Sequence, residues 1–294
     1  MLNKFDLLIP QTLEEALTLY AELGSKVKIL AGGTDVLVEM HGGHKAYPLL
    51  MDIKNLKELQ GVEYTPENGL VIGALTTHRS LERHPIVREI YPALFEGVSQ
   101  VGCAQTRYRG TIGGNICNAA PSGDSIGPVM VLNASVIVQG VNGQREILFN
   151  EFFPGPKKTV LQQGELMIKI LIPAPAPNSS SAYTKFTRRN AMDLALLGTA
   201  VDLTSDDGKT CKAVRVTLTT AAPTVIRATK TEEYLVGKEL TVEVMKEAGE
   251  IASAESKPRS SWRSSEEYRR EVLKAIVSRT IAIALERVKK GVDI

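Results

Sequence analysis

Apolar residues recur along most of this chain at helical or strand spacing, and polar turns separate the segments. In residues 12–23 (TLEEALTLYAEL), one face carries Leu13, Ala16, Leu17, Tyr20 and Leu23. This spacing is typical of an amphipathic helix packed on a sheet. Thr12 and Glu15 form a capping box at its start, and Gly24 closes it. The apolar run at 27–31 then predicts a buried strand.

The same periodicities predict the remaining elements. A short N-terminal strand ends at Pro10, and further strands are predicted at 49–53, 62–65, 70–74, 134–141, 145–148, 165–172, 182–188, 194–203 and 213–220. Helices are predicted at 34–40, 77–83, 91–101, 126–132, 229–236, 241–254 and 265–289. In the last helix, Leu273, Val277, Ile281, Ala284 and Val288 share one face, and Ser264 with Glu267 makes the capping box.

The second half of the chain therefore contains strands followed by helices, which indicates an α+β domain. It is separated from the first half by residues 173–181 (PAPAPNSSS), a run of Pro, Ala and Ser without core residues. We place the domain boundary there. The sequence predicts a first domain at 1–175 and a second at 176–294, in line with the two domains expected for 294 residues.

One central stretch departs from these patterns. Residues 101–124 (VGCAQTRYRGTIGGNICNAAPSGD) are rich in Gly, Thr, Asn and Ser, and we interpret them as a loop rather than a buried strand or helix. Gly113 and Gly114 lack Cβ atoms, so the backbone can approach a ligand closely. Thr111, Asn115 and Ser122 add short hydrogen-bonding groups. Successive N–H groups in such a turn can form a concave anion site.

A second glycine pair lies upstream, in residues 28–40 (KILAGGTDVLVEM). An apolar strand enters Gly32–Gly33, and Thr34 and Asp35 open an apolar-periodic segment. Backbone amides at such a helix start attract phosphate. Two loops of this kind suggest a ligand with two phosphates or a long nucleotide. The alternative is that the paired glycines form plain turns.

Composition narrows the functional classes. A hydrophobic content of 43% and a net charge of +2 are ordinary for a globular protein and do not favour nucleic acid or membrane as partners. No apolar run is long enough for a membrane span. The N-terminus lacks the apolar core and cleavage site of a signal peptide, so the cytoplasm is the expected compartment. Three cysteines without a CxxC pair argue against disulfides and metal clusters. His41 and His44 could share a metal, but a solvated HGGH loop is the preferred interpretation.

Familiar catalytic motifs are absent. The sequence has no GxGxxG, no GxxxxGK[ST] and no GxSxG. Nothing resembles a catalytic triad, a carboxylate pair for acid–base work or a metal cage, so we name no catalytic residue. Any chemistry would have to be carried by a bound cofactor that protein groups position and tune.

Three segments together resemble the flavin-binding subunits of molybdenum hydroxylases, including those of xanthine dehydrogenases and carbon monoxide dehydrogenase. They are AGGTDVL (31–37), QTRYRGTIGGN (105–115) and AAPSGD (119–124). Residues 183–193 (YTKFTRRNAMD) and 258–271 (PRSSWRSSEEYRRE) look most like separately encoded bacterial xanthine dehydrogenase subunits. The resemblance implies an FAD-binding fold of the vanillyl-alcohol-oxidase (PCMH) type, with subdomains at about 1–55 and 56–175. A small α+β C-terminal domain would follow.

The resemblance also implies a set of FAD-binding residues. The first wall of the site would contain Leu30, Ala31, Gly32, Gly33, Thr34, Asp35, Val36 and Leu37. The second would contain Thr111, Ile112, Gly113, Gly114 and Asn115. Asp124 would accept hydrogen bonds from ribityl or ribose hydroxyls. Val101 and Ile168 would contact apolar surface of the cofactor, and Lys185 would place a positive charge near the flavin.

Each of the isolated assignments has a structural alternative. Val101 and Ile168 could be core residues. Lys185 could be an exposed lysine at the rim. Asp124 could cap the helix that follows it. Arg107 and the Arg188–Arg189 pair could bind phosphate or form structural ion pairs.

One residue differs from the family pattern, and one insertion known from a relative is lacking. Tyr108 stands where relatives often have Asn, which puts the detailed loop contacts in doubt. The insertion that holds a 4Fe–4S cluster in the benzoyl-CoA-type relative is lacking, so we expect no such cluster in this chain.

The function implied is electron transfer by an FAD-carrying subunit of a heterotrimeric molybdenum hydroxylase of xanthine dehydrogenase type. A large partner chain would hold molybdopterin, and a small one would pass electrons from 2Fe–2S clusters to the flavin. NAD⁺ or another acceptor would then receive them. The rival is a stand-alone flavoprotein oxidase or reductase of the same fold, such as an enolpyruvyl-UDP-glucosamine reductase. We find no convincing equivalent here of the substrate-site groups that such a reductase supplies.

Overall fold

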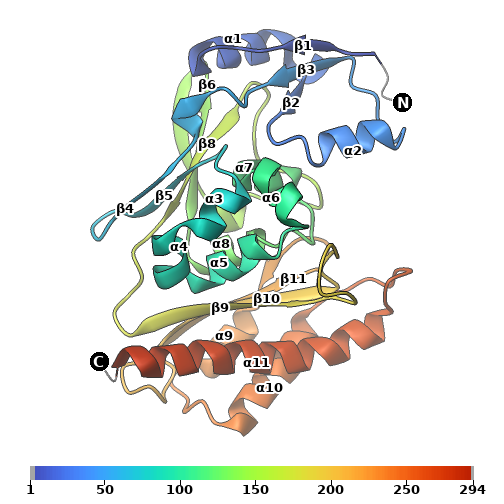
Figure 1. The fold of residues 1–294 in the computed structure, drawn as a ribbon. Helices are drawn as coiled ribbons and strands as arrows, with labels where there is room; N and C mark the ends of the chain where they lie inside the picture. Colours follow the sequence, from blue (N-terminus) through green and yellow to red (C-terminus); the bar gives the residue numbers. More distant parts are fainter. Residues whose placement is uncertain (1–3, 293–294) are drawn as a thin grey trace.

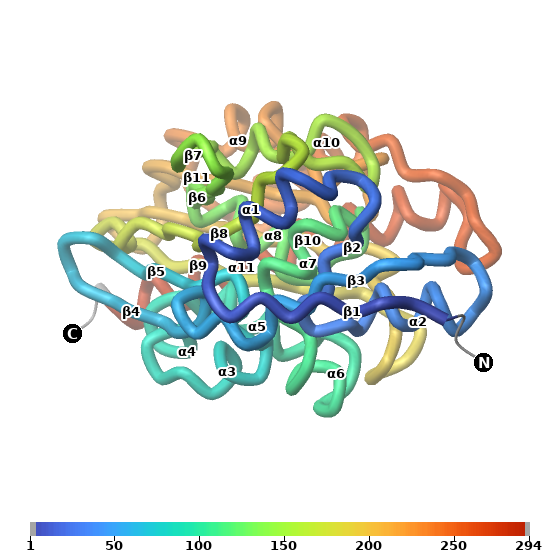
Figure 2. Tube along the Cα trace, turned by 90° about the horizontal axis from the view of Figure 1, so that it is seen from above, coloured from blue at the N-terminus to red at the C-terminus, as the bar shows by residue number. Residues whose placement is uncertain are grey.

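The computed structural model describes residues 4–292 and arranges them in three layers, one below the other in Figure 1. Each layer is built on its own sheet, with three, five and four strands in chain order. Figure 2 looks down on the molecule from the side of the first layer. Among the described residues, no helix combines the length and apolar character that a membrane span requires.

The first layer is a parallel sheet in the order β1-β3-β2. Its strands are β1 (Asp6–Leu8), β2 (Lys28–Leu30) and β3 (Leu49–Asp52). Parallel neighbours need a crossover connection, and α1 (Leu13–Leu23) supplies it between β1 and β2. Thr12 caps α1 as predicted, since its Oγ1 accepts the N–H of Glu15 at 3.2 Å. The short helix α2 (Val36–His41) follows the glycine pair.

The second layer is an antiparallel sheet in the order β4-β5-β8-β6-β7. The strands are β4 (Val62–Thr65), β5 (Gly69–Gly73), β6 (Ser135–Gly140), β7 (Gly143–Leu148) and β8 (Leu166–Ile172). Six short helices lie between this sheet and the third layer: α3 (His78–Arg83), α4 (Pro85–Ile90), α5 (Pro92–Ser99), α6 (Ala104–Arg109), α7 (Ile112–Asn118) and α8 (Ile126–Val131) (Figure 1). Apolar residues of the sheet and of all these helices except α6 form one continuous core.

The third layer is an antiparallel sheet in the order β12-β11-β10-β9, covered by helices on its outer face (Figure 1). The strands are β9 (Ser179–Phe186), β10 (Leu197–Thr204), β11 (Ala213–Thr219) and β12 (Ile226–Arg227). The helices are α9 (Thr229–Leu235), α10 (Val242–Glu255) and α11 (Glu266–Val292). Gly249 lets α10 approach α11 closely, because a Cβ there would lie 2.3 Å from the carbonyl oxygen of Lys274.

Most predicted elements are confirmed to within a few residues, but the central stretch is not. Residues 101–124 contain α6 and α7, so the interpretation of this region as a loop is wrong. The glycines do not prevent a helix here, because the hydroxyl of Thr111 caps α7 by accepting the N–H of Gly114 at 3.1 Å. Gly113 and Gly114 then lie in the first turn, where glycine costs less than at the centre of a long helix.

Smaller differences have local causes. Helix α4 was not predicted, although Pro85 stands at its first position, where proline is favoured. Strand β9 begins at Ser179, inside the predicted linker, and Ser181 is buried, with its hydroxyl accepting the N–H of Ala93. The cap of α11 is displaced by one residue, since Ser265 and not Ser264 accepts the N–H of Tyr268.

Candidate functional site

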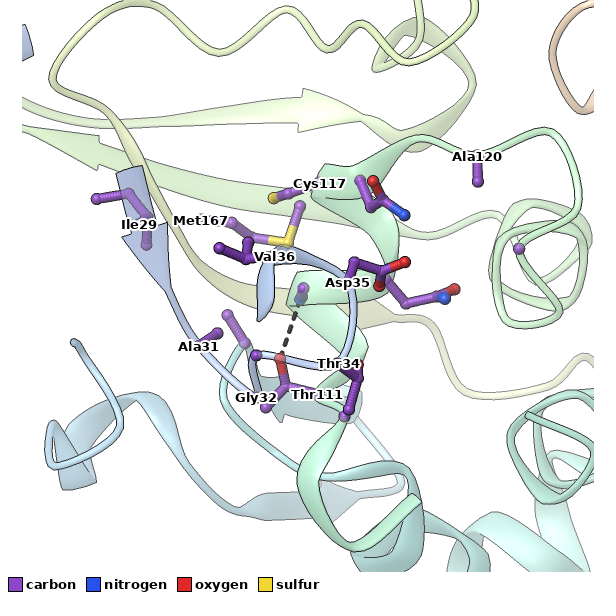
Figure 3. Close-up of a pocket in the computed structure, with 18 of the residues that line it drawn as sticks. Ile29, Ala31, Gly32, Thr34, Asp35, Val36, Thr111, Cys117, Ala120 and Met167 are labelled. Carbon is purple, nitrogen blue, oxygen red and sulfur yellow. Dashed lines mark hydrogen bonds between the residues drawn. The ribbon is translucent and has the colours of Figure 1, made fainter. Parts of the chain in front are cut away.

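A cavity of about 750 Å³ lies where the three layers meet, and both glycine segments line it. The first layer contributes the turn after β2, the second contributes α7 and the segment up to Asp124, and the third contributes residues 192–194. Figure 3 shows the turn at 31–36 facing Thr111, Cys117 and Ala120 across this space. The volume is within the range of cofactor sites.

The turn at residues 31–36 presents unused backbone donors to the cavity. Gly33 has φ +78°, a conformation that glycine adopts without strain. Within the described chain, the N–H groups of residues 32–36 have no protein acceptor, whereas the N–H of Leu37 is bonded to the carbonyl of Gly33. Consecutive unpaired amides beside a cavity are suited to an anionic group such as a phosphate.

The wall formed by α7 differs from expectation. Its first N–H groups are already bonded within the protein: Ile112 to Thr76 O at 3.0 Å, Gly113 to Ala74 O at 2.9 Å, and Gly114 to Thr111 Oγ1 (Figure 3). These three N–H groups therefore do not form the anion site that the sequence suggested for residues 101–124. Side chains on this wall, including Asn115, line the cavity instead.

The glycines of both walls bring protein segments together. A Cβ on Gly32 would lie 2.0 Å from Arg109 O, and one on Gly113 would lie 2.6 Å from Ala74 O. These two residues thus allow backbone to pack on backbone. A Cβ on Gly114 would meet Thr111 Oγ1 at 2.8 Å, and then only Ala31 Cβ at 3.9 Å across the cavity. Gly114 is the position where a larger side chain would project between the walls.

Asp124 is held by two residues of the third layer. Its Oδ1 accepts the hydroxyl of Tyr183 at 3.0 Å, and its Oδ2 accepts Lys185 Nζ at 2.8 Å. The side chains of Lys185 and Asp124 are only 5% and 8% exposed. Burial raises the pKa of Asp124 to about 6, although Lys185 and Tyr183 oppose that shift. Asp124 lines the cavity and does not cap α8, so the capping alternative is wrong.

The predicted site residues fall into two groups. Those that line the cavity are Ala31, Gly32, Gly33, Thr34, Asp35, Val36, Val101, Thr111, Gly113, Gly114, Asn115 and Asp124. Outside the lining lie Leu30, Leu37, Ile112, Ile168 and Lys185. Ile112 and Ile168 are core residues, and Lys185 is not an exposed rim lysine, since it reaches the site only through Asp124. Direct contact of these five with a cofactor stays a prediction.

The partners of Arg107 and Tyr108 lie outside the cavity. Arg107 forms an ion pair with Glu82 at 2.9 Å and donates to Val101 O, so it has a structural role. Tyr108 is 53% exposed and its ring lies under Arg79 and Arg83, away from the cavity lining. His41 and His44 are both exposed.

Several lining residues escaped the sequence analysis. His78 is buried, its Nδ1 has no partner within the described residues, and burial with nearby Arg107 lowers its pKa to about 4. It therefore faces the cavity as a neutral imidazole. Lys45 and Lys157 line the cavity and both pair with Glu39, at 3.5 and 3.8 Å, so these three side chains together carry one net positive charge. The basic pair in GPKK (155–158) was a usable signal for Lys157, but nothing in the sequence marks His78.

Comparisons with known proteins identify the family. The model of the FAD binding domain in molybdopterin dehydrogenase matches residues 3–175, and that of the CO dehydrogenase flavoprotein C-terminal domain matches residues 181–284. The chain belongs to the FAD-binding subunits of the molybdopterin dehydrogenases. It is an oxidoreductase subunit, and its cofactor is FAD.

Relatives of these FAD-binding subunits match over nearly their whole length. A putative xanthine dehydrogenase FAD-binding subunit of Escherichia coli (strain K12) is 34% identical and covers 93% of this chain and 94% of its own. The nicotinate dehydrogenase FAD-subunit of Eubacterium barkeri is 30% identical and covers 99% of each. The solved carbon monoxide dehydrogenase from Hydrogenophaga pseudoflava that lacks the Mo-pyranopterin moiety of its cofactor has a TM-score of 0.93, at 33% identity and 98% and 99% coverage.

The cavity of this FAD-binding subunit fits such a cofactor. The unpaired amides of residues 32–36 suit the diphosphate, and Asp124 offers carboxylate oxygens to hydroxyl groups. Cys117, whose pKa burial raises to about 12, is a neutral and apolar part of the lining. The lining thus combines polar groups with apolar surface, as a dinucleotide requires.

Proposed function

We propose that this chain is the FAD-carrying electron-transfer subunit of a molybdenum hydroxylase of xanthine dehydrogenase type, with NAD⁺ as the electron acceptor. The observation that carries the electron-transfer role is the make-up of the cavity. It offers donors and acceptors for a bound nucleotide, namely the unpaired N–H groups of residues 32–36 and the carboxylate of Asp124. The 34% identity to a xanthine dehydrogenase FAD-binding subunit supports the choice of substrate class.

In this proposal, the residues of the chain bind and orient FAD. The N–H groups of residues 32–36 hold the diphosphate, and Lys157 and Lys45 offset its charge at the mouth. Asp124 accepts from hydroxyl groups and is fixed in place by Tyr183 and Lys185. FAD, when bound, supplies the redox chemistry. The remaining task of the protein is alignment of the cofactor with its electron donor and acceptor.

Two partner chains complete the proposed enzyme. A large subunit holds molybdopterin and hydroxylates the substrate, and a small subunit carries 2Fe–2S clusters and passes electrons to this chain. The whole is a cytoplasmic heterotrimer. The names of the relatives support a subunit rather than a stand-alone reductase, since they are FAD-binding subunits of larger dehydrogenases.

The test is co-expression of the chain with the genes next to its own, followed by purification through a tag on this chain. We expect stoichiometric FAD, molybdenum and iron, and reduction of NAD⁺ on addition of xanthine. Nicotinate and carbon monoxide serve as comparison substrates, because related chains belong to enzymes named for them. A complex without FAD would refute the electron-transfer role. Turnover of nicotinate or carbon monoxide in place of xanthine would refute only the substrate class.

A further inference from the structure

A cluster of arginines and one tryptophan lies beside the mouth of the FAD cavity. The loop between β9 and β10 separates the two, because Met192, Asp193 and Leu194 line the cavity while Thr187, Arg188 and Leu196 line a groove on its other side. The start of α11 and the residues before it form the opposite edge of that groove. We call Arg188, Arg259, Trp262, Arg263 and Arg269 the arginine patch.

The positive charges of the arginine patch lack carboxylate partners. Within residues 4–292, none of its four arginines forms an ion pair. Two acids close to it in the sequence already have partners: Asp193 accepts from the backbone of Arg188 and Arg189 and pairs with Arg189, and Glu266 pairs with Arg270. Charges this close repel one another, so an added negative partner would stabilise the patch.

Arg269 is the buried member of the arginine patch. It is 3% exposed, donates to Leu196 O at 2.5 Å and to Ser261 Oγ at 3.2 Å, and has no acceptor for its Nε in the described chain. Burial and the neighbouring Arg259 and Arg263 lower its pKa. A buried cation without a counter-ion is costly. Its cost falls if a carboxylate docks over the groove that Leu196 lines.

The exposed side chains around these charges have the composition of a protein interface. Trp262, the only tryptophan, is 77% exposed, and the guanidinium groups of Arg188 and Arg263 each lie 5.0 Å from its ring. Met192 is 65% exposed and Tyr268 is 51% exposed. Trp, Tyr, Met and Arg are the residues enriched at the centres of protein–protein interfaces.

We propose that the arginine patch docks the electron-donating partner chain through a surface of clustered carboxylates around apolar side chains. This inference rests on the proposed function, which supplies such a partner. A chain docked here lies next to residues 192–194, at the edge of the cavity that holds the cofactor. That position is the one an electron donor needs.

The test uses the co-expressed complex and charge reversal at Arg188, which is exposed, and at Arg263, which is half-buried. Arg188→Glu with Arg263→Glu should weaken association with the partner chain by about 10- to 100-fold, and Trp262→Ala should weaken it by a similar factor. The matched control is Lys289→Glu with Lys290→Glu, the same charge change at the exposed far end of α11. Association is measured by titrating the purified chain with its partner, at low and at high salt.

The outcomes separate this inference from the proposed function. Support requires weaker association for the patch variants, unchanged association for the control, unchanged FAD content in all, and wild-type affinity that falls with salt. Equal association of patch and control variants overturns the inference while FAD binding stands. Intact association with a raised KM for NAD⁺ also overturns it, since the patch would then serve the soluble acceptor. Absence of FAD from the wild-type chain would instead refute the proposed function.

Discussion

Single residues decide how open the cofactor cavity is, and Gly114 is the clearest case. Replacing Gly114 with Val should abolish FAD binding. Its Cβ would lie 2.8 Å from Thr111 Oγ1, and the branched side chain would extend into the narrow space facing Ala31. Flavin absorbance per chain measures the effect. Gly155→Val is the control, because the nearest atom to a Cβ there is a flexible lysine carbon at 4.0 Å. Full flavin occupancy in Gly114→Val would contradict the placement of the site.

The buried pair of Asp124 and Lys185 should make the stability of the protein depend on pH. The pKa of Asp124 is raised from 3.8 to about 6. At pH values between these two, the carboxyl group is therefore protonated in the folded state and ionised in the unfolded state. The free energy of unfolding contributed by this group therefore falls as the pH rises from about 4 to 6, by about 3 kcal/mol for a shift of about two units.

The double variant Asp124→Asn with Lys185→Met removes both charges together. Urea unfolding at several pH values should show the wild type losing stability relative to this variant as the pH rises through that window. The exposed pair in Asp206→Asn with Lys212→Met serves as the control and should differ little from wild type. Parallel pH profiles of wild type and the double variant would mean that burial does not raise the pKa of Asp124.

At the scale of elements, the short helix α7 depends on one hydroxyl. Thr111→Ala removes the acceptor for the N–H of Gly114 and should lower the free energy of unfolding by about 1 kcal/mol, the usual effect of losing an N-cap. Flavin content should fall with it, since α7 forms one wall of the cavity. Thr111→Ser keeps the oxygen and should restore both. If Ser and Ala behave alike, the methyl group and not the cap is what matters.

How much of each element the sequence predicts follows from how much of its information is local. Helices α1, α10 and α11 carry their apolar residues at regular spacing, and they were predicted nearly to the residue. Helices α6 and α7 are short and lie in a polar, glycine-rich stretch, so periodicity could not detect them. The site shows the same division. The glycine turn at 31–36 is visible as a motif, whereas the bonds from Tyr183 and Lys185 to Asp124 span 59 and 61 residues.

On the scale of the whole molecule, polar contacts fasten the second layer to the third. Glu96 on α5 accepts the N–H of Tyr183 at 2.7 Å and forms an ion pair with Arg287 on α11. Arg287 also donates to Ser181 O at 2.7 Å. Arg215 on β11 donates to Val131 O at the end of α8. The Glu96–Arg287 pair joins α5 on one side of the β9–β12 sheet to α11 on the other, and Arg215 joins the sheet itself to α8.

Replacing Arg287 with Met should therefore loosen the junction between layers. Glu96 would keep a half-buried charge without its cation, and we expect the free energy of unfolding to fall by about 1–3 kcal/mol. Urea unfolding of the full chain measures this. Lys290→Met, an exposed cation on the same helix, should change little. Equal stability of the two variants would show that packing alone joins the layers.

The placement of Tyr183 and Lys185 on β9 has a consequence for modularity. The residues matched as an FAD-binding domain end at 175, yet both donors to Asp124 come from beyond that point. A fragment that stops there would expose a carboxylate whose two partners have been cut away. The FAD-binding module of this protein therefore cannot be transferred by itself. A fusion to another scaffold, or a gene split between the layers, would have to keep β9 together with the module.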